Sequence, residues 1–283
     1  MTDSPLRPTP ATPTPATPTP LAGRDLTLGY GRGPVSEHLD VEVPDGSFTA
    51  IIGPNACGKS TLLRALSRLL DPEEGSVVLD GRDIRDLPSR TIARRLGLLP
   101  QSSTSPSGIT VHDLVARGRF PHQSLLRQWS PEDDRAVAHA LAATGVTDLA
   151  GRRVDELSCG QRQRVWLSLV LAQETPLLLL DEPTTFLDLT HQLEVLDLCR
   201  GLHEGGGYTL VAVLHDLNLA FRYASHLIVM KQGRVIAQGR PEEVVDAALI
   251  EEVYDVPCLC LPDPVTGRPW IVPTGGPDSR RSA

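Results

Sequence analysis

Lysine is almost missing from this chain: of its 27 basic residues, only Lys59 and Lys231 are lysine. Long apolar runs are missing too, because the nearest candidate, residues 165–180, is interrupted by two polar residues and a proline. A membrane-spanning helix needs roughly 18–20 apolar residues. The N-terminus also lacks the basic region and apolar core of a secretory signal. We therefore expect a cytosolic protein that does not itself cross a membrane.

The five cysteines contain no C-x-x-C pair, and a structural disulfide is rare in the cytosol. Cys258 and Cys260, one residue apart, leave two interpretations open. They are either a metal or redox pair or two ordinary cysteines. Because no histidine cluster accompanies them, ordinary cysteines are the favoured interpretation.

The composition is that of a folded domain with a low-complexity extension. The chain has 283 residues, of which 40% are hydrophobic and 22% charged, enough for one large domain or a domain with a lobe. The net charge of −8 argues against nucleic acid as a main partner. Residues 1–20 are a Pro/Thr tract, which predicts a disordered or polyproline II arm. A ligand for a proline-binding module is the alternative.

Apolar and alternating segments predict an α/β domain that begins near residue 21. Strands are expected at 25–30, 39–43, 48–52, 76–79, 96–99, 177–180 and 209–214. Helices are expected at 110–117, 132–144 and 189–203. The first three strands are interpreted as a small antiparallel layer, and residues 102–165 as an inserted helical lobe. Strands separated by helices imply that the remaining sheet is mainly parallel.

Residues 53–61 fit the phosphate-binding pattern G-x-x-x-x-G-K-[ST]. An apolar segment precedes the motif and helically spaced leucines follow it, so it lies between a strand and a helix N-terminus. Backbone N–H groups and the helix dipole favour a bound anion there. The residues expected to cradle the phosphates are Gly53, Pro54, Asn55, Ala56, Cys57, Gly58, Lys59, Ser60 and Thr61.

Three positions of this loop have individual roles in the prediction. Gly53 and Gly58 let the backbone wrap closely around phosphate oxygens. Lys59 is expected to bridge the β- and γ-phosphates of a nucleotide. The Ser60 hydroxyl is expected to coordinate Mg²⁺.

Four consecutive leucines, residues 177–180, are followed by Asp181 and Glu182. A parallel strand that is covered on both faces is apolar throughout, and ligands bind at the carboxyl ends of such strands. We expect Asp181 to hold Mg²⁺ through water and Glu182 to polarise the attacking water. Without the phosphate loop, the same two residues would indicate only an acidic turn.

A third pattern, Leu-Ser-Cys-Gly-Gln at residues 157–161, opens a predicted helix. Ser158 is a good helix N-cap, and a helix start offers N–H groups to an anion. With the two preceding patterns, this pentapeptide resembles the L-S-G-G-Q signature of the nucleotide-binding subunits of ATP-binding cassette (ABC) transporters. The resemblance implies that Ser158 and Gly160 contact the γ-phosphate and that Gln161 belongs to the same nucleotide-binding set.

The resemblance extends over about residues 21–257 and implies an α/β fold of the P-loop NTPase type. In this ABC nucleotide-binding domain an antiparallel β layer accompanies the main sheet, the helical lobe spans about 102–165, and residues 258–283 form a C-terminal tail. Four further positions match the family by order and spacing. Gln101 matches the glutamine that senses Mg²⁺ and joins core to lobe. His215 matches the histidine that contacts the γ-phosphate, Asp188 the loop that crosses a dimer interface, and Tyr30 the aromatic residue that stacks on adenine.

Three positions within these motifs have residues with consequences of their own. Ala56 stands where relatives usually have glycine, and if that position needs a positive φ, alanine costs about 1 kcal/mol. Cys159 occupies the third signature position, which tolerates side chains in relatives. Cys57 lies within the phosphate loop, so thiol reagents are predicted to inhibit.

The resemblance further implies an ATPase that works as a head-to-tail homodimer with ATP and Mg²⁺. Each ATP lies between the phosphate loop of one subunit and the signature of the other, and hydrolysis opens the dimer. The expected partners are integral-membrane permease subunits and, indirectly, a substrate-binding protein, with no nucleic acid. The expected location is the cytoplasmic face of the cell membrane, peripherally.

The cargo is predicted from two finer resemblances. Gly-Arg-Phe-Pro-His at residues 118–122 resembles a stretch in ATPases that serve iron–siderophore, haem and vitamin B12 importers, although a simple turn leaving a helix is the local alternative. Residues 181–192 resemble the ferric-siderophore branch most closely. Siderophore import is therefore expected, with haem or cobalamin import as the alternative. A non-transport ABC ATPase is a distant alternative, because the chain has one cassette and no heptad run.

Overall fold

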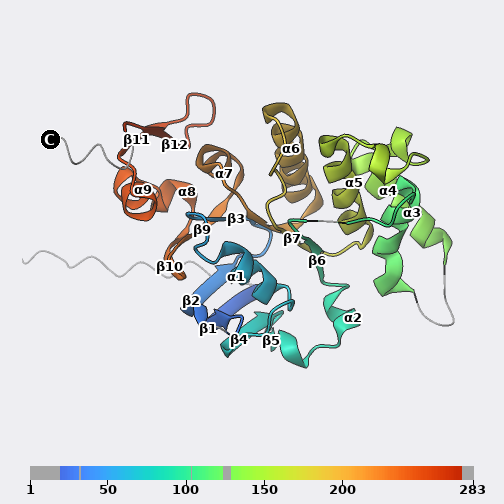
Figure 1. Cartoon of the computed structure of the whole chain (residues 1–283), viewed down its shortest axis with the longest axis horizontal. Coiled ribbons are helices and arrows are strands. Elements are labelled where there is room, and N and C mark those ends of the chain that lie inside the picture. Colours follow the sequence, from blue (N-terminus) through green and yellow to red (C-terminus); the bar gives the residue numbers. More distant parts are fainter. Residues whose placement is uncertain (1–19, 32, 103, 124–128, 276–283) are drawn as a thin grey trace, which may run out of the picture.

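The computed structural model describes residues 20–31, 33–102, 104–123 and 129–275. Apart from Pro20, the predicted Pro/Thr arm lies outside these residues. The described strands form three sheets, and helices cover both faces of the largest one (Figure 1).

The predicted site residues directly follow strands of the largest sheet. Its order is β10-β9-β3-β8-β7-β6, and every pairing is parallel except that between β10 and β9. The strands are β3 Phe48–Ile52, β6 Leu96–Leu99, β7 Leu177–Leu180, β8 Thr209–Val213, β9 His226–Lys231 and β10 Arg234–Gly239. The prediction of a mainly parallel sheet is confirmed.

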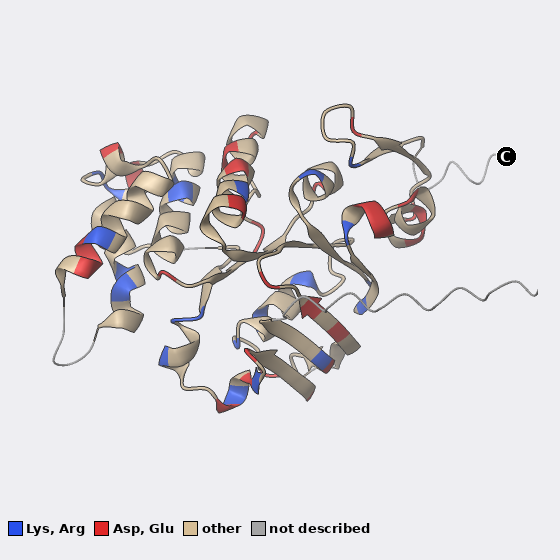
Figure 2. Ribbon diagram, turned by 180° about the vertical axis from the view of Figure 1, so that it is seen from behind, with Lys and Arg blue, Asp and Glu red and all other residues tan. Residues whose placement is uncertain are grey.

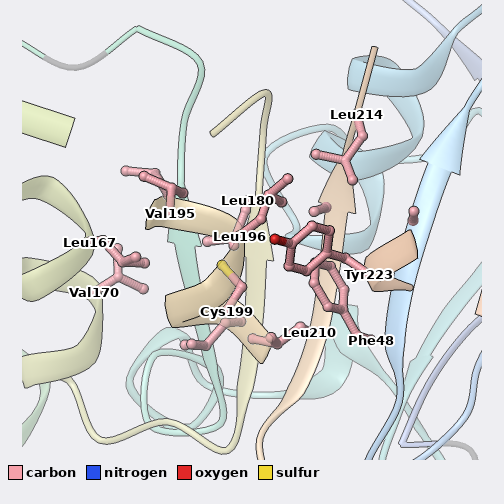
Figure 3. Close-up of a cluster of buried hydrophobic side chains, with 14 of the residues drawn as sticks. Phe48, Leu167, Val170, Leu180, Val195, Leu196, Cys199, Leu210, Leu214 and Tyr223 are labelled. Carbon is pink, nitrogen blue, oxygen red and sulfur yellow. The ribbon is translucent and has the colours of Figure 1, made fainter. Parts of the chain in front are cut away.

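The central strands β3, β7 and β8 are buried at every position because both faces of the sheet are covered. Ile51 and Leu179 belong to the core on the side of α1 (Lys59–Leu66), whereas Leu178 and Leu180 belong to the core on the opposite side. Figure 3 shows the second core, where Phe48, Leu180, Cys199 and Tyr223 come together from strands and helices. Burial on two faces is typical of parallel sheets and removes the alternation seen in half-exposed strands.

A smaller antiparallel sheet packs on the other side of α1, with the order β2-β1-β4-β5. Its strands are β1 Leu21–Gly29, β2 Pro34–Val43, β4 Glu74–Leu79 and β5 Arg82–Asp83. The assignment of residues 48–52 to this layer was wrong. All five residues of β3 are buried and pair in parallel with β8 and β9, because the strand lies in the interior of the large sheet.

A group of helices lies between β6 and β7 in the sequence and beside the large sheet in space (Figure 1). It comprises α3 Val111–Ala116, η2 Arg117–His122, α4 Pro131–Ala143, η3 Thr147–Leu149, η4 Val154–Glu156 and α5 Cys159–Ala172. The predicted helices at 110–117 and 132–144 correspond to α3 and α4. A short 3₁₀ turn, η1 (Ile84–Asp86), and α2 (Ser89–Ile92) connect β5 to β6.

The remaining elements follow β7 in the sequence, and α8, α9, β11 and β12 lie at the end of the molecule opposite the lobe (Figure 1). They are α6 Leu189–Gly206, α7 Leu217–Tyr223, α8 Pro241–Val244, α9 Ala247–Tyr254, β11 Cys258–Pro262 and β12 Pro269–Pro273. The β11–β12 hairpin is attached to α7 by two side chains. The Asn218 amide exchanges hydrogen bonds with the Ile271 backbone at 2.8 and 3.2 Å, and Arg268 donates to three carbonyls at the end of α7, those of Phe221, Arg222 and Ala224.

Charged residues of both signs are interleaved over the molecule, with acidic positions frequent on α6, α8 and α9 (Figure 2). This distribution is unlike the basic stripe that is typical of a nucleic-acid-binding surface. Among the described residues, no helix combines the length and apolar character required to traverse a bilayer.

Candidate nucleotide-binding site

The phosphate loop connects the end of β3 to the start of α1, as the sequence predicted. Gly53 and Gly58 have φ values of 153° and 103°. A Cβ on Gly53 would lie 2.2 Å from the Met230 carbonyl oxygen, and one on Gly58 would lie 2.7 Å from Ser36 Oγ. Both positions therefore require glycine for conformation and for space. Ala56 has a φ of 60°, so the positive φ considered for this position is present.

Lys59 is buried at the first position of α1, and its side chain turns back over the loop. Its Nζ donates hydrogen bonds to the carbonyl oxygens of Gly53 and Pro54, both at 2.8 Å. A cavity of about 300 Å³ opens beside it. The lining residues are Val35, Asn55, Ala56, Gly58, Lys59, Ser60, Thr61, Glu182 and His215. The structure thus brings Glu182 and His215 to the phosphate loop, and it adds Val35 of β2, for which the sequence held no signal.

Glu182 is held by three side chains that follow different strands. Gln101 Nε2 donates to Glu182 Oε2 at 2.8 Å, Thr185 Oγ1 donates to the same oxygen at 3.0 Å, and His215 Nε2 lies 2.8 Å from Oε1. Gln101 follows β6, Glu182 follows β7 and His215 follows β8, so the carboxyl edge of the parallel sheet gathers them. Thr185 was not among the predicted residues, although it lies three positions after Glu182.

The surroundings shift the pKa values of the two neighbouring carboxyl groups in opposite directions. Burial disfavours the charged form of Glu182, but hydrogen bonds from His215 and Thr185 outweigh it and lower its pKa. Burial raises the pKa of Asp181, assisted by the negative charge of Glu182 and opposed by the Ser60 hydrogen bond. Glu182 is therefore ionised at neutral pH and available as a proton acceptor.

Three side chains that could hold a magnesium ion lie near this carboxylate. Ser60 Oγ donates to Asp181 Oδ1 at 3.0 Å, and the Gln101 amide lies on the same edge through its bond to Glu182. Hydroxyl, carboxylate and amide oxygens are the hard ligands that Mg²⁺ prefers, and it usually retains waters and binds substrate phosphates. Within the part of the chain that the structure describes, no group of three or more His, Cys, Asp or Glu residues is placed to hold a metal ion.

The signature residues lie at the start of α5, in the helical lobe. Ser158 caps the helix: its Oγ accepts from the Gln161 backbone N–H at 3.3 Å, and the Gln161 side chain accepts from the Ser158 N–H at 3.1 Å. Gly160 is buried and Cys159 exposed. Asp188 caps α6 by accepting from the His191 N–H at 3.0 Å. Neither cap borders the cavity beside Lys59, so Ser158, Gly160, Gln161 and Asp188 do not line it in this chain.

Tyr30 lies at the end of β1 with about half of its surface exposed. Its hydroxyl donates to Thr61 Oγ1 at 3.5 Å and accepts from Arg64 Nη1 at 3.2 Å. The residue is therefore attached to α1, next to the phosphate loop, while its ring is accessible to a ligand.

The Gly-Arg-Phe-Pro-His stretch connects the helices of the lobe. It forms η2, which continues directly from α3. The buried Arg119 pairs with Asp133 of α4 at 2.8 Å and with Glu174 at 2.7 Å, and it also donates to the Ala172 carbonyl at 2.7 Å. His122 contacts the Gln173 carbonyl at 2.7 Å. These contacts give the stretch a structural role beyond that of a turn leaving a helix.

Cys258 and Cys260 lie on β11. Cys258 is buried in the main core together with Ile271. Burial raises the pKa of both thiols above its ordinary value. These are the surroundings of two ordinary protonated cysteines.

The combination of a phosphate loop after β3, acidic residues after β7 and a histidine after β8 defines a P-loop NTPase. Residues 36–185 match the family model described as ABC transporter. The chain is 58% identical over 255 residues to the ferric enterobactin transport ATP-binding protein FepC of Escherichia coli (strain K12), covering 90% of this chain and 94% of that protein. It therefore belongs to the ABC transporter family and is an ATP-binding subunit with ATPase activity. The predicted family and fold class are confirmed.

Two further relatives extend the comparison. The hemin import ATP-binding protein HmuV of Streptomyces coelicolor (strain ATCC BAA-471 / A3(2) / M145) is 44% identical over 273 residues, which cover 96% of each chain. Among solved structures, the dimeric structure of MJ0796, a bacterial ABC transporter cassette, superposes with a TM-score of 0.69 at 27% identity. That match covers 78% of this chain and 98% of the other.

Proposed function

We propose that this chain is the ATP-hydrolysing subunit of an importer for iron–siderophore complexes and that it acts with Mg²⁺ as a homodimer bound to membrane permease subunits. The carrying observation is the placement of Glu182. Its carboxylate borders the cavity of the phosphate loop and is oriented by Gln101, Thr185 and His215. This is the arrangement required of a group that accepts a proton from a water attacking a phosphate.

The proposed roles follow from the positions of the side chains. Lys59 and the N–H groups of the loop bind the phosphates, and Tyr30 offers its ring to the adenine. Ser60, Asp181 and Gln101 would hold Mg²⁺, which when bound neutralises charge on the phosphates. Glu182 accepts the proton of the attacking water, while His215 and Gln101 fix its orientation.

The homodimer is proposed because the signature lies apart from the phosphate loop within one chain. A second copy, oriented head to tail, would bring its Ser158, Gly160, Gln161 and Asp188 to the ATP bound at Lys59. The relative MJ0796 has been solved as a dimer, which supports this arrangement. ATP would then join the two copies, and hydrolysis would release them.

The Glu182→Gln variant tests the dimer. It should bind Mg-ATP without hydrolysing it, so light scattering should detect a dimer at saturating nucleotide and a monomer without it. The matched control is Glu204→Gln, an exposed acidic residue of α6, which should leave the oligomeric state unchanged. A Glu182→Gln protein that stays monomeric with saturating Mg-ATP, alone and together with its permease, contradicts the proposal.

The cargo is proposed from the relatives. The enterobactin transport protein is 58% identical to this chain and the hemin import protein 44%, which favours a siderophore and leaves haem as the second candidate. Uptake of radiolabelled ferric siderophore by a deletion strain tests this choice, with haem uptake measured in parallel. Loss of siderophore uptake alone supports the first candidate, and loss of haem uptake alone supports the second.

We also propose the domain organisation and location. The ATPase domain would span residues 21–257, with the helical lobe at about 102–165 and a C-terminal tail from 258. The helices α3 to α5, which lie between β6 and β7, support the lobe. The chain would be held at the cytoplasmic face of the membrane by its permease, while a separate protein binds the cargo.

A further inference from the structure

His191 lies on the first turn of α6, between Asp188 and Gly160. Its Nδ1 is 2.6 Å from Asp188 Oδ1. On its other side the imidazole covers the backbone of Gly160 on α5. A Cβ built on Gly160 would lie 2.3 Å from His191 Cδ2, so the ring occupies the space that any larger residue at 160 would need.

The side chain of His191 is not needed for the helix cap that Asp188 forms. The His191 backbone N–H already donates to Asp188 Oδ1 at 3.0 Å, and this is the capping bond. The bond from Nδ1 is an additional one to the same oxygen. It restrains the rotation of the Asp188 carboxylate, which is otherwise largely exposed.

The contact between Gly160 and His191 is continued one turn further along both helices. Arg164 of α5 and Glu194 of α6 form an ion pair at 3.6 Å between Nη1 and Oε2. In Figure 1, α5 and α6 lie next to each other, at the junction of the lobe and the large sheet. The starts of the two helices are thus held together by two contacts, the packing of His191 on Gly160 and the ion pair of Arg164 with Glu194.

We propose that His191 is a positioning residue that holds Asp188 and the signature helix at a fixed separation, so that both meet the ATP of a partner subunit together. The inference rests on the proposed function, since it concerns the surface that a second copy would use. Asp188 and Gly160 lie on different helices, and His191 contacts both. Its loss would leave ATP binding at Lys59 of the same chain intact and would impair only the closed dimer.

Three substitutions in the full-length chain separate the two contacts. His191→Ala removes both, His191→Asn keeps an amide donor toward Asp188, and His191→Phe keeps a ring over Gly160. The control is His112→Ala, because His112 also neighbours an aspartate, Asp113 at 3.5 Å, but lies on α3. Phosphate release measured over a range of Mg-ATP concentrations gives kcat and KM for each protein.

His191→Ala should lower kcat about tenfold or more, because a hydrogen bond to a charged group is lost at the closing surface. Its KM for ATP should stay within about twofold, since His191 does not contact the phosphate loop at which the same chain binds ATP. The Asn and Phe variants should each recover part of kcat. An unchanged kcat, a rise in KM that matches the fall in kcat, or Asn and Phe variants no better than Ala would overturn the proposal.

Light scattering on Glu182→Gln, with and without His191→Ala, distinguishes a failure of this inference from a failure of the proposed function. If Glu182→Gln forms an ATP-dependent dimer but the double variant Glu182→Gln/His191→Ala forms it equally well, only the role of His191 is wrong. If Glu182→Gln forms no dimer at all, the proposed dimer is wrong and the role of His191 fails with it.

Discussion

The two halves of the proposed ATP site are built in different ways. The phosphate half consists of Lys59, Ser60, Gln101, Asp181, Glu182 and His215. Its side chains bind each other across long stretches of sequence, as in the bonds from Gln101 to Glu182 and from Ser60 to Asp181, which join residues 81 and 121 positions apart. The signature half consists of Ser158, Gly160, Gln161, Asp188 and His191, where each hydrogen bond spans three residues at a helix start.

This difference indicates what each half needs in order to act. The phosphate half is assembled by the fold of the sheet, because four strands end at one edge. The hydrogen bonds of the signature half are local helix caps, and this half lies at the starts of α5 and α6. A site that is complete on one side and open on the other is suited to being closed by a second copy. Substitutions in the two halves should therefore have distinct effects.

Glu182→Gln should abolish most of the hydrolysis, because it removes the proton acceptor from the phosphate half. A loss of roughly 10²-fold or more in kcat is expected for a general base, with ATP still bound. Phosphate release and nucleotide binding measure the two effects separately, and Glu204→Gln is the control. Normal turnover in Glu182→Gln would remove this residue from the catalytic role.

Arg119→Met should destabilise the lobe that carries the signature half. The substitution leaves Asp133 buried without its cation, which costs about 3 kcal/mol of unfolding free energy. Arg135→Met is the matched control, because the exposed pair of Arg135 and Glu132 should contribute less than about 1 kcal/mol. Urea unfolding measures both, and equal effects of the two substitutions would contradict a special role for the buried pair.

The effect of Arg119→Met should depend on pH. Burial opposes the charge of Asp133, but hydrogen bonds from Arg119 and Ser130 outweigh burial and lower the pKa. A lowered pKa in the folded state gives stability that is present above the ordinary pKa of an aspartate and is lost as pH falls through the folded value. The difference in stability between wild type and variant should therefore shrink on acidification. A difference that stays constant from neutral to acidic pH contradicts this assignment.

Ser158→Ala should weaken the signature half in two ways. Loss of the N-cap costs about 1 kcal/mol of stability. Loss of a hydrogen bond to a phosphate should reduce kcat about tenfold. Thr110→Ala removes the equivalent cap of α3, where Thr110 Oγ1 accepts from the Asp113 N–H at 3.1 Å. Thermal unfolding should change alike in both variants, whereas only Ser158→Ala should lose ATPase activity.

Ala56→Gly should have the smallest effect. Glycine relieves the cost of about 1 kcal/mol for alanine at positive φ, but it also makes the unfolded chain more flexible. The net change in stability should stay below about 1 kcal/mol, with little change in the KM for ATP. Gly58→Ala is the contrast, because its Cβ would approach Ser36 Oγ at 2.7 Å, and ATP binding should fall sharply.

Much of the fold could be predicted because the large sheet leaves a simple pattern. The strands at 48–52, 96–99 and 177–180 were predicted with the observed boundaries, since parallel strands covered on both faces form short, mostly apolar runs. The same pattern cannot reveal which sheet a strand joins, and residues 48–52 were therefore placed in the wrong layer. The elements after β8 were not predicted. Their positions depend on contacts such as those of Asn218 and Arg268, which no local motif announces.

Prediction of the site was limited in the same way, because sequence motifs do not reveal every contact between side chains. Motif spacing predicted the backbone positions of the phosphate loop and the acidic residues after β7. The contact of His191 with Gly160 arises only when α5 and α6 pack together. The bond from Thr185 to Glu182 is local, but it belongs to none of the motifs that predicted the site. Sequence patterns therefore identified where the chemistry is placed, and the structure supplied the side chains that hold it there.

The attachment of the hairpin to α7 has a consequence for how the protein is made. Arg268 satisfies the carbonyl groups at the end of the helix that begins two residues after His215, yet it comes 47 residues after Phe221 in the chain. The ribosome releases residues in order, so this helix waits for its final hydrogen bonds until the hairpin has emerged. A nascent chain thus acquires the segment beside His215 in finished form only late in its synthesis, after the strands of the large sheet are already available to fold.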